Sequence, residues 1–321
     1  MSIRAIDLFC GAGGSSSGAQ KAGVKIVAGF DMWLPAVQTY KANFPEVRVF
    51  DKDIRGLSPQ DIQSEIGDVD LILASPECTN HSVAKGAAPR DEESRMTAFQ
   101  VLRFAEAFRP KWVVIENVTE MTAWDRHDEL LERLSELGYI SQQQRFFNAQ
   151  NFSVPQSRKR LFLICSQSIV PDVTEPTDRI ELKPASSILD TSGRYRLSPL
   201  RKPGRAEATL ARADRAIVAL GMQERFLIVY YGSDGSGGWQ RIDKPLRTIT
   251  TLDRFAYVEP SPEGHMMRML QPEELKLAMG YDRQFKLDLP HLSRRDRIKL
   301  MGNGVCPPVM EHIVRTLTNQ R

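Results

Sequence analysis

Residues 69–78 read Val69-Asp70-Leu71-Ile72-Leu73-Ala74-Ser75-Pro76-Glu77-Cys78 and join a short apolar run to a polar turn that ends in a cysteine. A second apolar run, Trp112-Val113-Val114-Ile115, ends in Glu116-Asn117-Val118. Short apolar runs of this kind indicate buried strands of a parallel sheet. Open parallel sheets carry their active sites at the edge where the carboxyl ends of the strands meet. We therefore expect the Cys78 thiol and the Glu116 carboxyl group to face one pocket.

The same pattern extends over residues 1–165, where short apolar runs alternate with amphipathic stretches. This alternation predicts an α/β domain built on a parallel sheet. Strands are expected at residues 4–9, 25–30, 47–50, 71–74, 111–116, 139–148 and 160–165. Helices are expected at residues 14–22, 35–43, 97–108 and 127–137.

The composition changes near residue 170, where prolines and glycines become frequent. We interpret residues 170–294 as a second, smaller, loop-rich domain with strand-like pieces at 226–231 and 246–251 and a short helix at 272–280. The tail, residues 302–321, has a turn-and-helix pattern and is expected to pack back on the first domain. The first domain is therefore assigned residues 1–169 and 295–321.

Composition and charge exclude several classes of protein. The chain has 321 residues, of which 41% are hydrophobic and 26% are charged, as in ordinary globular proteins. No apolar stretch approaches the ~20 residues that span a bilayer, so no membrane partner is expected. The N-terminus has no leader of signal-peptide type, which favours a cytoplasmic protein, and we expect a monomer.

The cysteines and basic residues bear on cofactors and partners. The four cysteines are widely spaced and the five histidines form no cluster, so no metal site is expected. The net charge of +3 is small, but arginines and lysines gather at 158–160, 194–205, 212–215 and 294–295. Each cluster alone is explained by a solvated surface, whereas several beside one cleft suit a phosphate backbone.

A glycine-rich turn follows the first predicted strand and contains Phe9-Cys10-Gly11-Ala12-Gly13-Gly14. Glycine lets a backbone approach a ligand closely, and the helix that follows offers free N–H groups. Such a turn binds nucleotide-like cofactors, or it is merely a tight turn. It lacks the Gly-Lys-Ser/Thr of a phosphate loop and the full dinucleotide fingerprint.

Two further strand ends carry acidic residues. Asp31 can accept hydrogen bonds from both ribose hydroxyls of an adenosine, or it can cap the helix that begins near Pro35. Asp53 can accept a hydrogen bond from an adenine amino group. Glycine, acid and acid at successive strand ends, without a phosphate-binding lysine, suit S-adenosylmethionine better than a dinucleotide.

Four side chains beyond the cofactor turn suggest chemistry. Cys78 has polar, turn-forming neighbours, which favour a reactive thiol over the more common buried cysteine. Glu116 is either a cap at the end of its strand or an acid of raised pKa that donates a proton to a ring nitrogen. Arg158 and Arg160 alternate along one strand and are expected to converge on an anion or a carbonyl oxygen.

These pieces, in this order, resemble the cytosine-5 DNA methyltransferase family over nearly the whole chain. The matching segments are residues 7–14, Asp31, Asp53, Pro76-Glu77-Cys78, Glu116-Asn117-Val118, Gln156-Ser157-Arg158-Lys159-Arg160, residues 246–250, residues 268–274 and Gly302-Asn303-Gly304-Val305. The chain departs from the family pattern at Glu77 and Thr79, which flank the cysteine, and at Asp31, where glutamate is usual.

The resemblance implies a Rossmann-like sheet with helices on both faces and a smaller target-recognition domain. It also implies a reaction on a cytosine that is flipped out of double-stranded DNA. In that reaction the Cys78 thiolate adds to C6, Glu116 protonates N3, Arg158 holds the carbonyl oxygen of the base, and C5 takes the methyl group of S-adenosylmethionine. Arg160 is the fourth expected catalytic residue.

The cofactor contacts implied by the resemblance are Phe9, Cys10, Gly11, Ala12, Gly13, Gly14, Asp31, Met32, Asp53, Ile54, Pro76, Asn303 and Val305. A cognate restriction endonuclease is a further expected partner. Two alternatives remain open, namely methylation of transfer-RNA-like molecules by the same chemistry and a catalytically silent protein that only binds nucleic acid.

Overall fold

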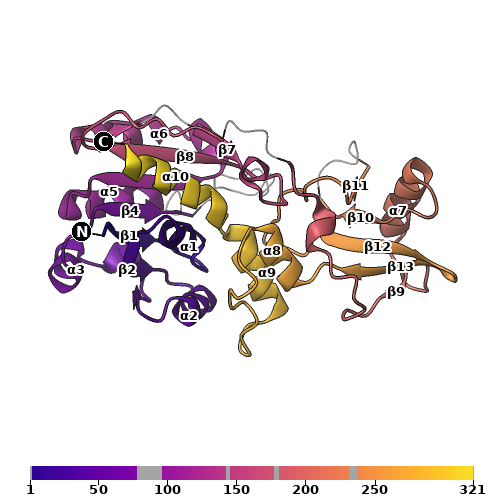
Figure 1. Ribbon diagram of the computed structural model, residues 1–321. Coiled ribbons are helices and arrows are strands. Elements are labelled where there is room, and N and C mark those ends of the chain that lie inside the picture. The colour runs from indigo at the N-terminus through magenta and orange to yellow at the C-terminus, as the bar shows by residue number, and fades with distance from the viewer. Residues whose placement is uncertain (1, 78–95, 142–144, 177–180, 232–236, 321) are drawn as a thin grey trace.

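The computed structural model describes residues 2–77, 96–141, 145–176, 181–231 and 237–320. Two sheets lie at opposite ends of the molecule, with two helices, α8 (Pro272–Ala278) and α9 (Arg294–Asn303), between them (Figure 1). The larger sheet belongs to the N-terminal half and the smaller one to residues 198–269.

The larger sheet has the strand order β3-β2-β1-β4-β5-β8-β6, and β7 also pairs with β8. Its strands are β1 (Arg4–Leu8), β2 (Lys25–Phe30), β3 (Arg48–Phe50), β4 (Leu71–Ala74), β5 (Trp112–Asn117), β6 (Ile140–Ser141), β7 (Arg145–Asn148) and β8 (Lys159–Ser166). The pairs from β3 to β5 are parallel, as the apolar runs predict. This is the Rossmann-like core expected from the sequence.

The last long strand corrects the expectation of a purely parallel sheet. Strand β8 runs antiparallel to β5 and pairs Glu116 with Phe162 and Asn117 with Leu161. Because of this direction, β8 begins at the edge where β5 ends. The antiparallel pairing therefore brings the arginines at the start of β8 to the carboxyl edge of the parallel strands.

Helices cover both faces of this sheet because both faces are apolar. Leu71 and Leu73 belong to one buried cluster, and the alternate residues Ile72 and Ala74 belong to another. The first cluster contains side chains of α1, α2 and α10, and the second contains side chains of α3, α5 and α6. These helices are α1 (Gly14–Lys21), α2 (Leu34–Asn43), α3 (Pro59–Ile66), α5 (Thr97–Phe108), α6 (His127–Glu136) and α10 (Pro307–Asn319).

The smaller sheet is antiparallel and has the order β11-β10-β12-β13-β9. Its elements are β9 (Ser198–Pro199), α7 (Glu207–Leu220), β10 (Phe226–Val229), β11 (Trp239–Arg241), β12 (Phe255–Ser261) and β13 (Gly264–Met269). Phe226 and Ile228 pack with α7, whereas Leu227 and Val229 belong to the main core cluster. One face of the smaller sheet is thus continuous with the core of the whole molecule.

Several expected elements differ from those observed. The strand expected at 139–148 forms two short strands, β6 and β7. Residues 246–251 form no strand, because this segment makes a single bridge, Gln156 to Leu246, and is otherwise held by side chains. Helices α3, α7 and α9 were not predicted. Among the described residues, no helix is both long and apolar enough to cross a membrane.

The C-terminal helix packs on the first domain, as expected, and the contact is close at Gly18 of α1. A Cβ atom there would lie 2.4 Å from the carbonyl oxygen of Pro307 and 2.7 Å from the amide nitrogen of Glu311. We predict that Gly18→Ala lowers the free energy of unfolding by about 1–3 kcal/mol, because backbone atoms must move apart. Urea denaturation measures this change.

Gly56→Ala is the matched control, since a Cβ atom at Gly56 meets no atom within 4 Å. Its stability should change by less than about 0.5 kcal/mol. A Gly18→Ala protein as stable as the wild type would show that α1 and α10 are not packed as described.

Candidate active site

The turn after β1 is held in an unusual backbone conformation. Phe9 has φ 58°, Gly11 has φ 54° and Gly13 has φ 95°. A Cβ atom at Gly13 would lie 2.2 Å from the ring of Phe44, and one at Gly14 would lie 2.1 Å from the carbonyl oxygen of Val305. The turn therefore needs glycine at both positions, and Gly14 brings the start of α1 against the segment that contains Val305.

A buried carboxyl group, Asp7, supports this turn from below. Its Oδ2 accepts hydrogen bonds from the amide of Ser16 at 3.1 Å and from the Ser16 hydroxyl at 2.6 Å. The Ser16 hydroxyl also lies 2.7 Å from the hydroxyl of Tyr40. Asp7 Oδ1 has no partner in the part of the chain that the structure describes. Burial raises the pKa of Asp7 to about 7, and the Ser16 hydrogen bonds oppose this rise.

Asp31 lies beside the turn, as the sequence predicts. Its Oδ2 accepts from the amide of Gly11 at 2.9 Å, and its Oδ1 accepts from the amide of Trp33 at 2.8 Å. Burial raises the pKa of Asp31, although these hydrogen bonds lower it. Each carboxylate oxygen keeps capacity for another donor, so the ribose contact stays a prediction. Asp31 does not cap α2, whose N-cap residue is Trp33.

The carboxylate of Asp53 is paired with Arg55, which the sequence did not predict. It accepts from the amide of Arg55 at 3.0 Å and pairs with the Arg55 guanidinium at 2.6 Å. The hydrogen bond from Arg55 lowers the pKa of Asp53. A contact from Asp53 to adenine would have to share the carboxylate with Arg55.

The other expected cofactor residues differ in exposure. Met32 is 67% exposed and Asn303 is also exposed, so both can meet a ligand from solvent. The remaining residues are buried, namely Cys10, Ala12, Ile54, Pro76 and Val305.

Glu116 is buried at the carboxyl end of β5, with 6% of its surface exposed. Its Oε1 lies 3.3 Å from Nε of Arg160. Burial raises the pKa of Glu116, and Arg160 and then Arg158 oppose this rise. The three side chains line a cavity of about 10 Å³, which holds about one water molecule. Glu116 and Arg160 thus lie side by side at the carboxyl end of β5, a contact that the sequence did not predict.

Arg158 makes main-chain contacts that the sequence did not predict. Its Nη1 donates to the carbonyl oxygen of Ile249 at 3.0 Å, and its Nη2 donates to the carbonyl oxygens of Gly302 at 2.9 Å and Gly304 at 3.0 Å. The side chain is buried. Main-chain oxygens thus occupy both terminal nitrogens of the Arg158 guanidinium. Arg160 is the arginine beside Glu116, and the substrate contact expected of Arg158 stays a prediction.

Gln156 is a further residue of the site that the sequence reasoning did not single out. It is fully buried, accepts from the amide of Ile249 at 2.9 Å and donates to the carbonyl oxygen of Ala278 at 3.1 Å. Polar residues inside an otherwise apolar region were the available signal, since such groups need partners. Gln156 thus joins the start of β8 to the segment between β11 and β12 and to the end of α8.

The expected nucleophile, Cys78, lies outside the described residues. The residues just before Cys78 are described. The side-chain amide of Asn117 donates to the carbonyl oxygen of Pro76 at 3.2 Å, so the turn after β4 is joined to the end of β5. Among the described residues, no group of three or more histidine, cysteine or acidic side chains could hold a metal ion.

The parallel core, the glycine turn and the acidic strand ends define the class of S-adenosylmethionine-dependent methyltransferases. The chain matches the family model described as C-5 cytosine-specific DNA methylase over residues 3–319. It therefore belongs to this family.

Curated relatives share about one third of their residues with it over the matched region. The Type II methyltransferase M.DdeI of Desulfomicrobium norvegicum is 33% identical over 192 residues, covering 58% of this chain and 45% of that protein. M.HgiDI of Herpetosiphon aurantiacus is 34% identical over 165 residues, covering 50% of this chain and 52% of that protein. The chain spans about half the length of these relatives.

Solved structures show the same fold over nearly the whole chain. The Entamoeba histolytica methyltransferase EhMeth has a TM-score of 0.72 at 18% identity and covers 99% of this chain and 98% of that one. The Schizosaccharomyces pombe (S. pombe) Dnmt2 methyltransferase has a TM-score of 0.72 at 16% identity and covers 98% of both chains.

The residues present fit S-adenosylmethionine, the cofactor of this family. A Cβ atom at Gly11 meets nothing within 4 Å, so the turn is open where a ligand approaches. Asp31 retains acceptor capacity beside it, and the N-terminus of α1 begins at Gly14. An acceptor for hydroxyl groups and an open turn at the start of a helix are the features that bind an adenosine with an amino-acid tail.

Asp7 makes the stability of the protein depend on pH. Its pKa is about 7 in the folded state, against 3.8 for the ordinary carboxyl group, so the folded protein binds more protons between these values. The free energy of unfolding therefore falls as pH rises through this window. We predict that Asp7→Asn, whose side chain stays neutral, removes this pH-dependent fall of a few kcal/mol in the free energy of unfolding.

The measurement is the difference in free energy of unfolding between Asp7→Asn and wild type at pH 4.5 and pH 8. The difference should shift in favour of the variant at the higher pH. A difference that is independent of pH would show that Asp7 is ionised in the folded protein throughout the window.

Proposed function

We propose that this chain transfers a methyl group from S-adenosylmethionine to carbon 5 of cytosine in a specific double-stranded DNA sequence. The observation that carries the proposal is the site at the carboxyl edge of β4 and β5. Ala74 pairs with Ile115 in the sheet, so the turn that leads to Cys78 leaves beside Glu116. The hydrogen bond from Asn117 to Pro76 fixes this neighbourhood.

The other three cysteines are buried thiols of raised pKa and are poor nucleophiles. This comparison supports Cys78 as the proposed nucleophile. Cys10, Cys165 and Cys306 are all buried. Burial raises the pKa of Cys10 well above its ordinary value and raises the pKa of Cys165 and of Cys306 to about 11. A thiol needs its thiolate form to attack carbon, so these three groups are suited to packing.

In the proposed reaction, the Cys78 thiolate forms a bond to C6 of a cytosine that has left the DNA stack. Glu116 has a raised pKa and donates a proton to N3, so negative charge does not accumulate on the ring. Arg160 is next to Glu116 and has the donors to hold the neighbouring carbonyl oxygen of the base. C5 then takes the methyl group. Loss of the C5 proton, return of the N3 proton to Glu116 and release of Cys78 restore the aromatic ring.

The bound cofactor supplies an electrophilic methyl group on a sulfonium centre. The chain's residues orient it: Asp31 for the ribose, Asp53 and Ile54 for the adenine, and the turn that includes Phe9 for the amino-acid tail. Asn303 and Val305 close the pocket from the other side. Support comes from the contact of Gly14 with Val305, which places this segment against the turn.

Residues 170–294 are proposed to recognise the DNA sequence. Their smaller sheet lies at the opposite end of the molecule from the larger sheet (Figure 1). Two tyrosines of this segment are engaged within the protein: Tyr231 donates to the carbonyl oxygen of Thr248 at 2.8 Å, and Arg212 lies over the ring of Tyr230. Since the curated relatives are named Type II methyltransferases, a restriction endonuclease for the same sequence is the proposed partner.

The test is transfer of a labelled methyl group into unmethylated double-stranded DNA of mixed sequence and, separately, into total RNA. Wild type should label DNA at carbon 5 of cytosine. Cys78→Ser should lose this activity, and Glu116→Gln should lose about 10²–10⁴-fold in rate, because an amide cannot donate the same proton. Both variants should still bind S-adenosylmethionine in calorimetry.

Cys165→Ser is the matched control, because it makes the same chemical change at a buried thiol that lies 3.3 Å from the hydroxyl of Ser141. It should retain activity. Transfer into RNA alone, or a covalent DNA adduct at Cys10, Cys165 or Cys306, would contradict the proposal.

A further inference from the structure

We propose that the contact between Trp33 and Lys299 positions Asp31, the acceptor for the ribose of the cofactor. Trp33 and Lys299 are positioning residues, since neither has to touch the cofactor itself. This inference rests on the ribose role that is proposed for Asp31. It is drawn from a cation–π contact in which Nζ of Lys299, on α9, lies 4.3 Å from the ring centre of Trp33, at the start of α2.

Trp33 occupies a position in which a polar side chain is usual. It is the N-cap residue of α2, and within the described residues its side chain makes no capping hydrogen bond. Serine, threonine, aspartate and asparagine are preferred at an N-cap because they do make one. The neighbours Met32 and Leu34 are exposed, whereas Trp33 is partly buried against the main core cluster. The indole is therefore fixed by core packing and by the Lys299 ammonium.

The main chain of Trp33 holds the carboxylate of Asp31. Asp31 Oδ1 accepts from the amide of Trp33 at 2.8 Å, and Oδ2 accepts from the amide of Gly11 at 2.9 Å. Aspartate has a short side chain, so its oxygens follow any shift of the backbone closely. Because a main-chain N–H group fixes each oxygen, movement of Trp33 would move the acceptor that faces the ribose.

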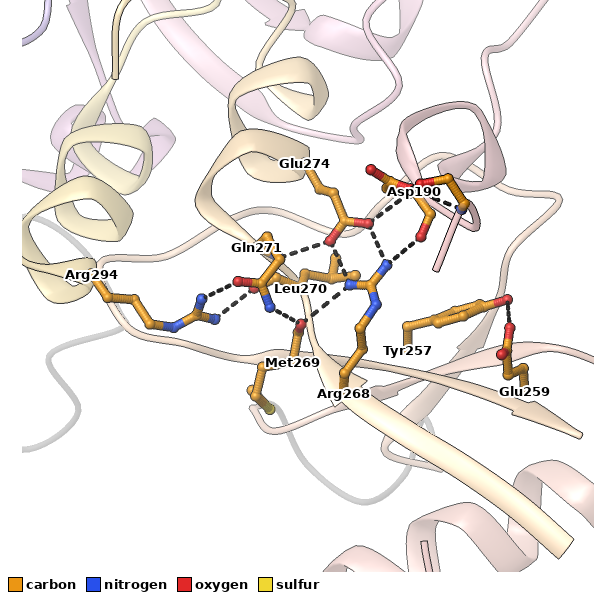
Figure 2. A network of polar contacts seen from close by, with 10 residues as sticks. Asp190, Tyr257, Glu259, Arg268, Met269, Leu270, Gln271, Glu274 and Arg294 are labelled. Atoms are coloured by element: carbon orange, nitrogen blue, oxygen red, sulfur yellow. Dashed lines mark hydrogen bonds and ion pairs between the residues drawn. The ribbon is translucent and has the colours of Figure 1, made fainter. Parts of the chain in front are cut away.

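Helix α9 is a fixed support for Lys299. Its first residue, Arg294, donates to the carbonyl oxygen of Leu270 at 2.6 Å and to the side chain of Gln271 at 2.8 Å, as Figure 2 shows. Arg294 also pairs with Asp253 at 2.7 Å. The N-terminal end of α9 is thus held by three partners.

The C-terminal end of α9 is held by Arg158, which donates to the carbonyl oxygens of Gly302 at 2.9 Å and of Gly304 at 3.0 Å. Lys299 lies between the two ends of the helix, four residues before Asn303. Residues with this spacing lie on one side of a helix, and both side chains are exposed. The ammonium and the expected cofactor contact Asn303 therefore share one side of α9.

The contact joins two parts of the cofactor region that are far apart in sequence. Asp31 follows β2 and Asn303 ends α9, and helices α2 and α9 are neighbours (Figure 1). The other end of α2 has its own attachment, because Nδ2 of Asn43 donates to the carbonyl oxygen of Lys286 at 2.9 Å and Oδ1 accepts from the Lys286 amide at 2.7 Å. Loss of the Trp33 contact should therefore loosen only the end of α2 that lies next to Asp31.

This arrangement can influence affinity without a direct contact to the ligand. Tryptophan is the aromatic ring that binds a cation best. Without the cation, the free protein also populates conformations in which Trp33 and the Asp31 carboxylate are displaced. The apparent Kd for the cofactor then rises by the inverse of the fraction that stays competent for binding. We therefore expect a moderate loss of affinity rather than its abolition.

Lys299→Met tests the contact because it nearly keeps the length of the side chain and removes its charge. Lys299 is exposed, so the core should remain intact. Lys286→Met is the matched control, since it makes the same change at an exposed lysine whose bonds to Asn43 use the main chain. Lys299→Arg is the conservative variant, because it restores a cation over the ring.

Two quantities are measured for each protein: the Kd for S-adenosylmethionine by calorimetry without DNA, and the free energy of unfolding in urea, which shows that the Kd refers to folded protein. Lys299→Met should raise the Kd about three- to tenfold, whereas Lys299→Arg and Lys286→Met should stay within about twofold of wild type. Trp33→Leu should raise the Kd to a similar degree, and adding Lys299→Met to it should raise the Kd no further.

A double variant shows whether the effect passes through Asp31. In an Asp31→Ala protein, adding Lys299→Met should change the Kd by less than about twofold, because the acceptor that the contact positions is gone. A Lys299→Met protein with the wild-type Kd overturns the inference. A rise in Kd that is the same with and without Asp31 overturns it as well.

Asp31→Ala alone tests the proposed function separately, and we expect it to weaken the binding of S-adenosylmethionine. Wild-type affinity in Asp31→Ala would contradict the ribose role of Asp31, and this inference would fail with it. Weakened binding in Asp31→Ala beside unchanged binding in Lys299→Met overturns the inference and leaves the proposed function standing.

Discussion

The structure depends on one buried guanidinium, that of Arg158, which binds three main-chain oxygens from two distant segments. Ile249 belongs to the segment between β11 and β12, and Gly302 and Gly304 lie at the end of α9. Gln156 reinforces the same point through the amide of Ile249 and the carbonyl oxygen of Ala278. A buried cation without these oxygens would be strongly unfavourable. The segment that contains Arg158 must therefore meet both the segment around residue 249 and the end of α9.

The main-chain contacts of Arg158 also position residues of the candidate active site. Gly304 precedes Val305, whose carbonyl oxygen lies against Gly14, so the Arg158 contacts also set one wall of the cofactor region. Two residues further on, Arg160 meets Glu116 because β8 runs antiparallel to β5. The same short sequence thus contains Arg158, which joins distant segments of the chain, and Arg160, which contacts Glu116.

The sequence predicted what depends on local pattern. The parallel strands, α5 at its observed bounds and the position of Glu116 at a strand end all follow from apolar periodicity and turn residues. The roles of the two arginines could not be separated, because alternation gives a shared face but not the partners supplied by residues 249 and 302–304. Helix α7 was missed although its alanines and Gly221 favour a helix with a defined end, since nearby prolines and glycines dominated the interpretation.

The most direct test of this account compares Arg158→Lys with Arg160→Lys. Lysine keeps the charge but cannot bind three carbonyl oxygens in a fork. Arg158→Lys should lose about 2–4 kcal/mol of unfolding free energy in urea denaturation. Arg160→Lys should keep its stability within about 1 kcal/mol and lose about 10²-fold in methyl transfer. An Arg158→Lys protein with wild-type stability and a selective loss of rate would contradict the account, because Arg158 would then act on the substrate.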